Sequence, residues 1–516
     1  MTLYEFIMEF FFLYSEPLDS EPFYNLYETI IIFPELFFTI CIFFLLMFCV
    51  LLSTSRNKNY PLILFSALHL SILICIFTFF LINNNKINFT TTFFNNTLII
   101  DNLSIVSKEL ILIFFICCLL IIKNYLIKQQ INTFEYLILM LFSVLGLIIL
   151  CSANDLITAY LSIEIHSLAF YLLAAYKKNS IFSTKAGLKY FILGAFSSCM
   201  FLFGSSLIYG FSGTTNFDDL KDLFLFSYPT NTTFNIDLVF FGLIFILISL
   251  FFKLAIAPFH IWSPDVYEDS LSSSTLIFTI LPKISLFILF IRIFNSSFLT
   301  FIDYTRLYLV LAGLFSIIIG AFVGLEQRKI KSLLAYSSIS HMGYLILVLS
   351  TGIVTNLHII FSYLIVYIIS NLFIWTIVLN LNFKTSYPKK TNKDLSDFNS
   401  LVISNPLIAL ILSLTIFSLA GLPPLIGFYV KMSVFLTLIE NTQYLSAIIA
   451  IICSVISAFY YIRLIKIIYF EKKITSHLYF PLSYEMSLFI SIGFFFLIGL
   501  FLTPNIFYLF CYQFLL

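Results

Sequence analysis

Ionisable side chains occur deep inside segments that are otherwise apolar. Glu164 lies within LITAYLSIEIHSLAFYLLAAY, Lys253 near the end of an apolar run that begins at residue 237, and Lys283 within STLIFTILPKISLFILFIRIF. His341 and Lys431 occupy KSLLAYSSISHMGYLILVLSTG and LAGLPPLIGFYVKMSVFLTLIE. A charged side chain at the centre of a membrane helix costs about 2.5–3.5 kcal/mol. We therefore expect these groups to face the interior of a helix bundle, paired or hydrated.

The chemistry that such a set could perform is proton transfer. Burial in hydrocarbon disfavours the charged form of a lysine, and a nearby carboxylate favours it. A lysine balanced between these two effects can take up and release protons. One buried lysine is often a packing or ion-pairing residue, but five deep ionisable groups on five different segments favour a proton relay.

Three further polar residues have weaker claims to a role in this relay. His260 follows Lys253 by two helical turns and is nominally on the same face, although a structural hydrogen bond would equally explain it. His166 is only two residues from Glu164, so it should point to a different face of the helix. Glu35 lies early in the first apolar segment, where a structural role at the membrane interface is the simpler interpretation.

The composition defines the class of protein that holds these residues. The chain has 516 residues, of which 61% are hydrophobic and only 10% are charged, and its mean hydropathy is +1.04. A soluble protein of this size needs more charge on its surface, so we predict an all-α polytopic membrane protein. At roughly 20 apolar residues per crossing, the sequence contains fourteen candidate spans, of which the twelfth is too long for one straight helix. Their predicted limits are 29–53, 60–82, 102–122, 134–152, 154–176, 185–210, 237–263, 273–295, 305–326, 330–352, 355–381, 402–440, 443–466 and 486–509.

Lysine and arginine are concentrated in alternate loops between these spans. The odd-numbered loops carry Arg56, Lys58, Lys123, Lys128, Lys177, Lys178, Arg328, Lys329, Lys384, Lys389, Lys390, Lys393, Lys472 and Lys473. The even-numbered loops and the termini carry few. By the positive-inside rule the odd loops face the cytoplasm or matrix, and both termini face the opposite side. The seventh loop is an exception, because it contains Asp265, Glu268 and Asp269.

Two spans are interrupted at corresponding positions. The seventh contains Pro258, and the twelfth contains AGLPPLIG at residues 420–427. Paired interruptions of this kind indicate a transport site. Spans four to eight (134–295) and nine to thirteen (304–466) then form two five-helix units, inverted because each crosses an odd number of times. Residues 29–133 form three flanking helices, 467–516 a C-terminal helix, and 1–28 an N-terminal extension.

No sequence motif for a cofactor is present. The chain contains no GxGxxG, no Walker loop, no haem-like pair of histidines and no CxxC among its nine cysteines. We expect it to bind no nucleotide, redox cofactor, metal or nucleic acid. Its heavy use of Phe, Ile, Asn and Tyr is typical of an AT-rich genome such as that of an organelle.

The motifs resemble a known family. SANDLITAYLSIEIHSLAFYLLAAYKKNS, FKLAIAPFHIWSPDVYEDS, EQRKIKSLLAYSSISHMGY and SLAGLPPLIGFYVKMSVF are similar to the chain 2 family of NADH–ubiquinone oxidoreductase, respiratory complex I, whose bacterial counterpart is subunit N. The resemblance covers about residues 30–510. It implies two inverted five-helix bundles with flanking helices, and a non-redox subunit that contributes a proton path to an H+-translocating NADH:ubiquinone reductase.

The resemblance also implies a location, partners and roles for individual residues. It places the chain in the mitochondrial inner membrane with its termini facing the intermembrane space, among lipids and other membrane-arm subunits. NAD, FMN, iron–sulfur clusters and ubiquinone would be held by other subunits. The implied site consists of the ion-paired glutamate Glu164, its partner Lys253, the bridging Lys283, the central His341, the terminal Lys431, His260 after the helix break, and Lys189 in GLKYFILGAF as a residue that assists the pair.

Three other functions remain open from the sequence. The first is another antiporter-like subunit of the same complex, or of a multisubunit cation/proton antiporter; Lys431 and the chain length favour chain 2. The second is a transporter for a small anion, which would need more polar ligands at the helix breaks than Leu, Ile and Phe provide. The third is a structural assembly subunit with a silent channel.

Overall fold

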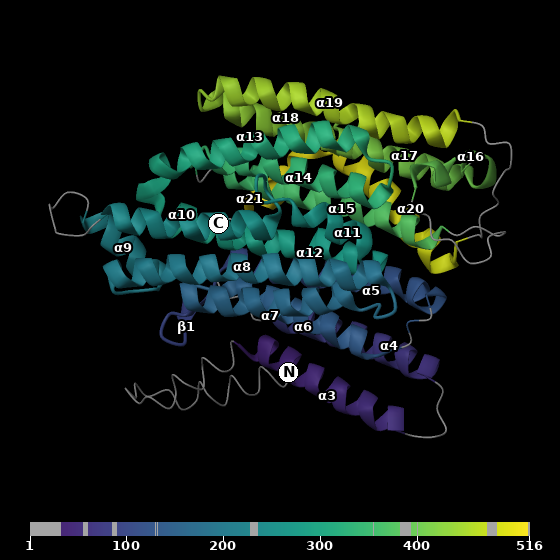
Figure 1. The fold of residues 1–516 in the computed structure, drawn as a ribbon, viewed down its shortest axis with the longest axis horizontal. Coiled ribbons are helices and arrows are strands. Elements are labelled where there is room, and N and C mark those ends of the chain that lie inside the picture. The colour runs from purple at the N-terminus through teal and green to yellow at the C-terminus, as the bar shows by residue number, and fades with distance from the viewer. Residues whose placement is uncertain are drawn as a thin grey trace.

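The computed structural model describes residues 32–54, 60–84, 90–129, 131, 133–227, 236–353, 356–381, 394–399, 401–471 and 482–513. Long helices run roughly parallel to one another, from α3 at one edge to α19 at the other (Figure 1). Thirteen helices in this part of the chain are long and apolar enough to cross a membrane. The predicted all-helical, polytopic fold is therefore confirmed. The predicted N-terminal extension, 1–28, lies outside the described residues.

The helices fall into four groups along the chain. The flanking helices are α3 (Phe33–Thr54), α4 (Tyr60–Asn84) and α5 (Asn102–Lys128), with a hairpin of β1 (Thr91–Phe93) and β2 (Leu98–Ile100) before α5. The first unit comprises α6 (Glu135–Ser152), α7 (Leu156–Ala175), α8 (Ile181–Ser212), α9 (Phe217–Ser227), α10 (Ile236–Leu254), α11 (Trp262–Asp269) and α12 (Ser272–Ile291). The second unit comprises α13 (Ile302–Glu326), α14 (Ile330–Leu349), α15 (Leu357–Asn380), α16 (Leu401–Ser404), α17 (Pro406–Ala420), α18 (Ile426–Glu440) and α19 (Tyr444–Tyr469). The C-terminal group is α20 (Tyr484–Leu502) and α21 (Pro504–Gln513).

Local sequence signals determine where several helices begin and end. Asp101 caps α5, where its side chain accepts a hydrogen bond from the Ser104 N–H, and Asp155 caps α7 by accepting one from the Ile157 N–H. Such caps satisfy N–H groups that have no partner inside the helix. Helix α8 ends at Gly213, whose φ of 77° is readily adopted by glycine.

The structure refines three of the predicted spans. The span predicted at 237–263 ends at Leu254 and resumes as α11 at Trp262. The span predicted at 402–440 is two helices of 15 residues, α17 and α18, separated at Gly421, whose φ is 78°. The last span, predicted at 486–509 as one helix, divides before Pro504, because proline cannot donate the hydrogen bond that a continuing helix requires.

The packing of the two units follows a common pattern. In the first unit α6 contacts α7 and α12, and in the second unit α13 contacts the corresponding helices α14 and α19. The discontinuous helix of each unit, α10–α11 or α17–α18, packs against the third helix, α8 or α15. Each unit therefore has the same arrangement around one broken helix.

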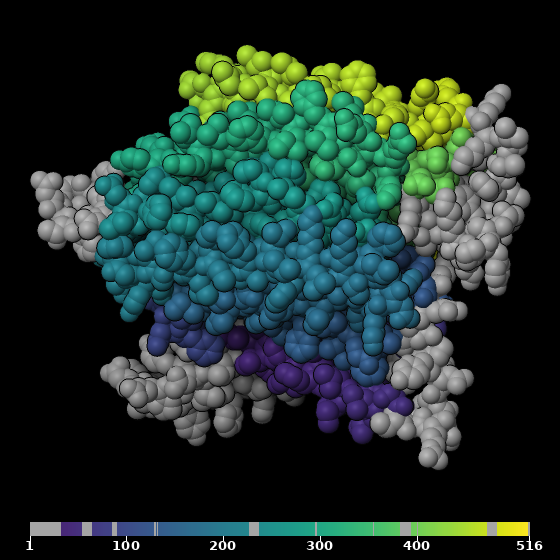
Figure 2. All heavy atoms as spheres, in the orientation of Figure 1, coloured from purple at the N-terminus to yellow at the C-terminus, as the bar shows by residue number. Residues whose placement is uncertain are grey.

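The centre of the molecule lies where the two units meet. In the apolar stretches of α12, α14 and α15, 94–100% of the residues are buried, whereas only 22% of the residues are buried in those of α3 and α20. Helix α12 contacts α15, and α11 contacts α14. Side chains fill the spaces between neighbouring helices on the face shown in Figure 2. Ionisable groups on α12 and α14 are thus enclosed by protein rather than by lipid.

Candidate functional site

The first helix break holds the ammonium group of Lys283. Lys283, on α12, is 1% exposed and donates a hydrogen bond of 2.8 Å to the carbonyl of Leu254, the last residue of α10. Carbonyl groups at the C-terminal end of a helix lack partners within that helix and form the negative end of its dipole. The break therefore creates an acceptor that suits a buried cation.

The second break is arranged in a similar way. Lys431, on α18, is 6% exposed and donates a hydrogen bond of 2.8 Å to the carbonyl of Ala420, the last residue of α17. Gly421 makes room for this lysine, because a Cβ atom at Gly421 would lie 2.6 Å from the Lys431 Cδ. In each unit an ammonium group thus meets the carbonyl end of the first half of the broken helix. The lysine comes from the following helix in the first unit and from the second half of the broken helix in the second.

Lys253 and Glu164 are both in the interior but do not touch. Lys253 donates a hydrogen bond of 3.2 Å to the hydroxyl of Tyr171, and its ammonium lies 5.7 Å from the centre of that ring. The Glu164 Oε1 is buried and has no hydrogen-bond partner within the described part of the chain. The ion pair implied by the resemblance is thus open here, with Tyr171 in contact with the lysine. Sequence reasoning missed Tyr171, although it follows Glu164 by seven residues and so lies two turns along the same helix face.

His341 is held by tyrosines from two other helices. It is 4% exposed, its Nδ1 shares a hydrogen bond of 2.7 Å with the hydroxyl of Tyr363 on α15, and its Nε2 shares one of 3.3 Å with that of Tyr461 on α19. The ring of Tyr367 is also close, 5.1 Å from the imidazole centre to centre. No sequence signal distinguishes these tyrosines, because the chain contains 30 of them.

A small cavity separates His341 from Lys431. It has a volume of about 20 Å³ and is lined by both residues together with Tyr363, Tyr367 and Ser418. A polar cavity larger than about 10–15 Å³ can hold a water molecule. One water here could connect the imidazole and the ammonium through hydrogen bonds.

The other two predicted site residues are at the first break and on α8. His260 is half-buried in the first break, and its buried Nδ1 has no protein partner among the residues described. Lys189, on α8, forms an ion pair with Asp265 on α11. The structure therefore assigns Lys189 a carboxylate partner in the acidic seventh loop, and that partner is not Glu164.

His166 is buried within α7. It is 2% exposed, donates from Nδ1 to the Ser162 carbonyl at 3.1 Å, and is close enough for its charge to interact with that of Lys253. His166 also packs against α6, where a Cβ atom at Gly146 would lie 2.7 Å from its backbone nitrogen. That it points to a different face of the helix from Glu164 stays a prediction.

Two largely buried ion pairs hold the flanking helices, one between two of them and one to the end of α12. Glu35 on α3 pairs with Lys108 on α5 at 2.5 Å, and Asp101 pairs with Arg292, just after α12, at 2.7 Å. Burial raises the pKa of Asp101, but the Arg292 charge and the hydrogen bond from Ser104 outweigh it and bring the pKa of Asp101 below its ordinary value. Lys108 was not singled out from the sequence, although a lysine in the third apolar segment was the available signal.

Comparison with known protein families gives one match that covers more than half of the chain. Residues 153–457 match the model described as NADH:quinone oxidoreductase/Mrp antiporter, TM. This range begins before α7 and ends within α19. It includes Glu164, Lys253, Lys283, His341 and Lys431.

Similar proteins extend the match to nearly the whole chain. NADH-ubiquinone oxidoreductase chain 2 of Marchantia polymorpha is 38% identical over 487 residues, which cover 94% of this chain and 98% of the relative. NADH-quinone oxidoreductase subunit N of Pelagibacter ubique is 40% identical over 343 residues, 66% of this chain and 70% of the relative. Among solved structures, a chain of respiratory complex I from Thermus thermophilus with bound aureothin has a TM-score of 0.74 at 24% identity, covering 92% of this chain and 97% of its own. At that identity the last comparison concerns the fold alone.

Proposed function

The chain belongs to the NADH:quinone oxidoreductase/Mrp antiporter transmembrane family, and from this premise we propose that it translocates protons as the chain 2 (subunit N) component of respiratory complex I. It is an antiporter-like membrane subunit of that enzyme complex and assembles with other membrane-arm subunits. Electron transfer from NADH to quinone, with NAD, FMN, iron–sulfur clusters and ubiquinone, is assigned to the other subunits. The contribution of this chain is a path for protons.

The observation that carries the proposal is the placement of one ammonium group at each helix break. Lys283 and Lys431 each donate to a carbonyl that the interruption of a helix leaves without an intrahelical partner. A backbone carbonyl accepts a hydrogen bond from the ammonium but carries no net charge. A carboxylate in its place would be an anion that depends on the ammonium for its neutralisation. Each lysine can therefore lose its proton without leaving an unpaired buried anion behind.

The proposed path follows the contacts across the molecule. Lys253 immediately precedes Leu254, whose carbonyl accepts from Lys283, so both lysines are at the same end of α10. Helix α12, which carries Lys283, contacts α14, which carries His341. His341 and Lys431 then share the small cavity. We assign transfer in the order Lys253, Lys283, His341 and Lys431, with Glu164 controlling the charge of Lys253.

His260 and Lys189 receive supporting roles. The free Nδ1 of His260 marks the first break as a place that a water molecule could enter. Lys189, through Asp265, holds α8 against α11 beside the same break. Both would affect access to Lys253 rather than transfer along the central path.

The proposed location follows from the relatives and from the loop charges. We place the chain in the mitochondrial inner membrane as a multi-pass, organelle-encoded subunit. Because Lys and Arg are concentrated in the odd-numbered loops, these would face the matrix, and both termini would face the intermembrane space.

The direct test replaces each break lysine in the assembled complex. Lys283→Met and Lys431→Met should each reduce the number of protons translocated per NADH oxidised, measured in reconstituted vesicles with a pH-sensitive dye. Lys466→Met is the matched control, because Lys466 is exposed on α19. If both break variants assemble and pump as many protons per NADH as the control, the chain is a structural subunit with a silent channel and the proposal fails.

A further inference from the structure

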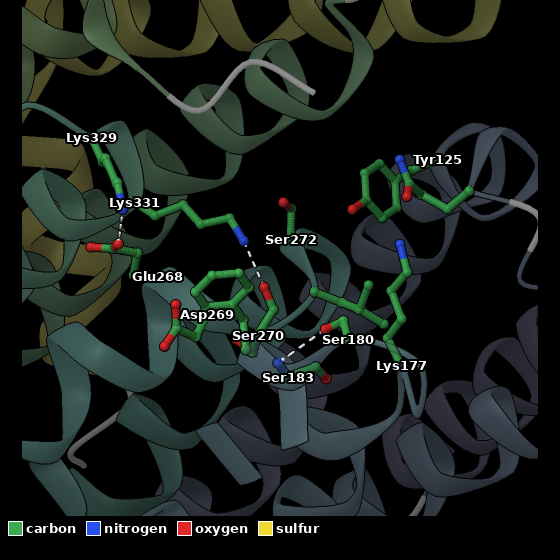
Figure 3. Close-up of a pocket in the computed structure, with 13 residues that line it drawn as sticks. Tyr125, Lys177, Ser180, Ser183, Glu268, Asp269, Ser270, Ser272, Lys329 and Lys331 are labelled. Atoms are coloured by element: carbon green, nitrogen blue, oxygen red, sulfur yellow. Dashed lines mark hydrogen bonds and ion pairs between the residues drawn. The ribbon is translucent and has the colours of Figure 1, made fainter. Parts of the chain in front are cut away.

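A cavity of about 210 Å³ lies where the ends of five helices meet on one side of the molecule. It is bordered by the C-terminal ends of α5 and α11 and by the N-terminal ends of α8, α12 and α14 (Figure 3). The ends of α5, α8 and α14 connect to odd-numbered loops rich in Lys and Arg, whereas α11 and α12 meet in the acidic seventh loop. A water molecule needs only about 10–15 Å³, so the cavity has room for a larger polar group.

The charges around this cavity are separated. On one side Glu268 forms an ion pair with Lys329 (Figure 3). Burial, followed by the neighbouring Glu268 carboxylate, raises the pKa of Asp269 on the same side. The Lys331 side chain runs from this side to the middle of the cavity, and the Lys177 ammonium lies on the opposite side, so that the part between these two lysines is positively charged (Figure 3).

Polar groups that can contact an anion accompany these two lysines. Lys331 is 7% exposed and donates a hydrogen bond of 2.7 Å to the Ser270 carbonyl, which holds its ammonium at the cavity. The side chains of Ser272 and Tyr125 line the space between Lys331 and Lys177 (Figure 3). Ser270 is 3% exposed, lines the cavity, and has a hydroxyl with no hydrogen-bond partner within the described ranges. The site thus offers hydroxyl groups as well as charges.

Three long helices begin at the cavity. The side chain of Ser180 caps α8, whereas α12 and α14 have no side-chain cap. The first N–H groups of a helix lack intrahelical partners, and the helix dipole makes this end positive. Together these features favour a bound anion, and phosphate is one of the anions that helix N-termini bind.

We propose that this cavity binds a phosphate group, either that of an anionic phospholipid headgroup or free inorganic phosphate, through Lys177, Lys331, Ser272 and Tyr125. A bound headgroup would place its acyl chains beside Phe182, which also lines the cavity and is 66% exposed. Because the cavity is bordered by a flanking helix and by both five-helix units, the bound anion would connect all three.

The test uses the assembled complex in nanodiscs of equal parts phosphatidylcholine and phosphatidylglycerol. A photoactivatable phosphatidylglycerol is cross-linked to the complex, and labelled peptides that contain residues 177–183 or 268–272 are quantified by mass spectrometry. A photoactivatable phosphatidylcholine is the comparison lipid. In a second arm, binding of radiolabelled inorganic phosphate is measured on complex held in phosphatidylcholine alone.

Lys177→Gln should weaken binding about fivefold, as expected for one surface lysine near a lipid anion. Lys178→Gln is the matched control, because Lys178 is the exposed neighbouring residue and does not line the cavity. Lys331→Met should abolish binding and Lys331→Arg should restore it. If the Lys331→Met complex does not assemble, the comparison of Lys177→Gln with Lys178→Gln still shows whether the cavity binds a phosphate group.

The two arms identify the source of the phosphate. Selective cross-linking of the anionic lipid that is weakened by Lys177→Gln indicates a headgroup. Phosphate binding with the same dependence but without cross-linking indicates a free anion. If neither probe distinguishes Lys177→Gln from Lys178→Gln, the cavity is not a phosphate site.

Discussion

Tyr171 gives Lys253 a hydrogen-bond partner other than a carboxylate. Its hydroxyl accepts from the Lys253 ammonium, and Gly194 on α8 makes space for it, because a Cβ atom at Gly194 would lie 2.0 Å from that hydroxyl. Glu164 lies on the same helix two turns earlier. In the proposed path Lys253 would exchange between this neutral hydroxyl and the Glu164 carboxylate, and the exchange would change how readily it releases a proton.

The first prediction concerns Tyr171→Phe, which removes the hydroxyl and keeps the ring. Because one neutral hydrogen bond contributes about 0.5–1.5 kcal/mol, we expect the rate of proton translocation coupled to NADH oxidation to fall by less than about tenfold. Lys253→Met should have the larger effect. Tyr209→Phe, at an exposed position on α8, is the control. An effect of Tyr171→Phe as large as that of Lys253→Met would contradict a positioning role for the hydroxyl.

At the scale of the helices, the second break depends on close contact between the two halves of the interrupted span. Gly427, in the first turn of α18, lies against the last turn of α17, and a Cβ atom there would lie 1.9 Å from the Ser418 carbonyl oxygen. Only glycine permits this approach. The contact determines where Lys431, four residues later, meets Ala420.

The second prediction is that Gly427→Ala disturbs both packing and proton transfer. Forcing a methyl group into this contact should cost about 1–3 kcal/mol and displace the Lys431 ammonium from its carbonyl. We expect less assembled complex on native gels and fewer protons translocated per NADH in the complex that does form. Gly499→Ala on α20 is the matched control, since its Cβ would meet nothing within 4 Å. If Gly427→Ala assembled and translocated protons as well as Gly499→Ala, α17 and α18 would not need this close contact, and the prediction would be wrong.

At the scale of the whole molecule, a largely buried ion pair holds a flanking helix against the central units. The pair of Asp101 and Arg292 joins the start of α5 to the end of α12. A buried pair stabilises a fold less than its geometry implies, but the loss of one partner leaves a charge without compensation. The pair therefore acts mainly to hold α5 in register with α12.

The third prediction follows from this asymmetry. Arg292→Met should destabilise the folded chain by about 3–5 kcal/mol, measured as a lower thermal stability of the assembled complex. The double variant Asp101→Asn with Arg292→Met should be destabilised less. Because Asp101 has a lowered pKa in the fold, the pair stabilises the protein above the ordinary aspartate pKa of about 4. This contribution is lost as the pH falls through the folded value. A double variant that is no more stable than Arg292→Met would refute the role of the pair.

The sequence by itself determined the fold class, the approximate spans and the residues whose burial in the membrane carries a high free-energy cost. Lys283, His341 and Lys431 could be recognised because a charged or imidazole side chain stands out in an apolar segment. The prolines at both breaks could be recognised because proline interrupts a helix. The proton-transfer roles of these residues stay predictions. Chain 2 similarity could also be seen from contiguous motifs.

Only the tertiary structure decided which group each of these residues meets. Tyr363 and Tyr461 reach His341 from helices that are distant in the sequence, and Lys189 meets Asp265 rather than Glu164. The carbonyl partners of Lys283 and Lys431 belong to the backbone, which carries no residue-specific signal. A sequence records the cost of burying a side chain, whereas the partner that offsets this cost depends on how the helices pack.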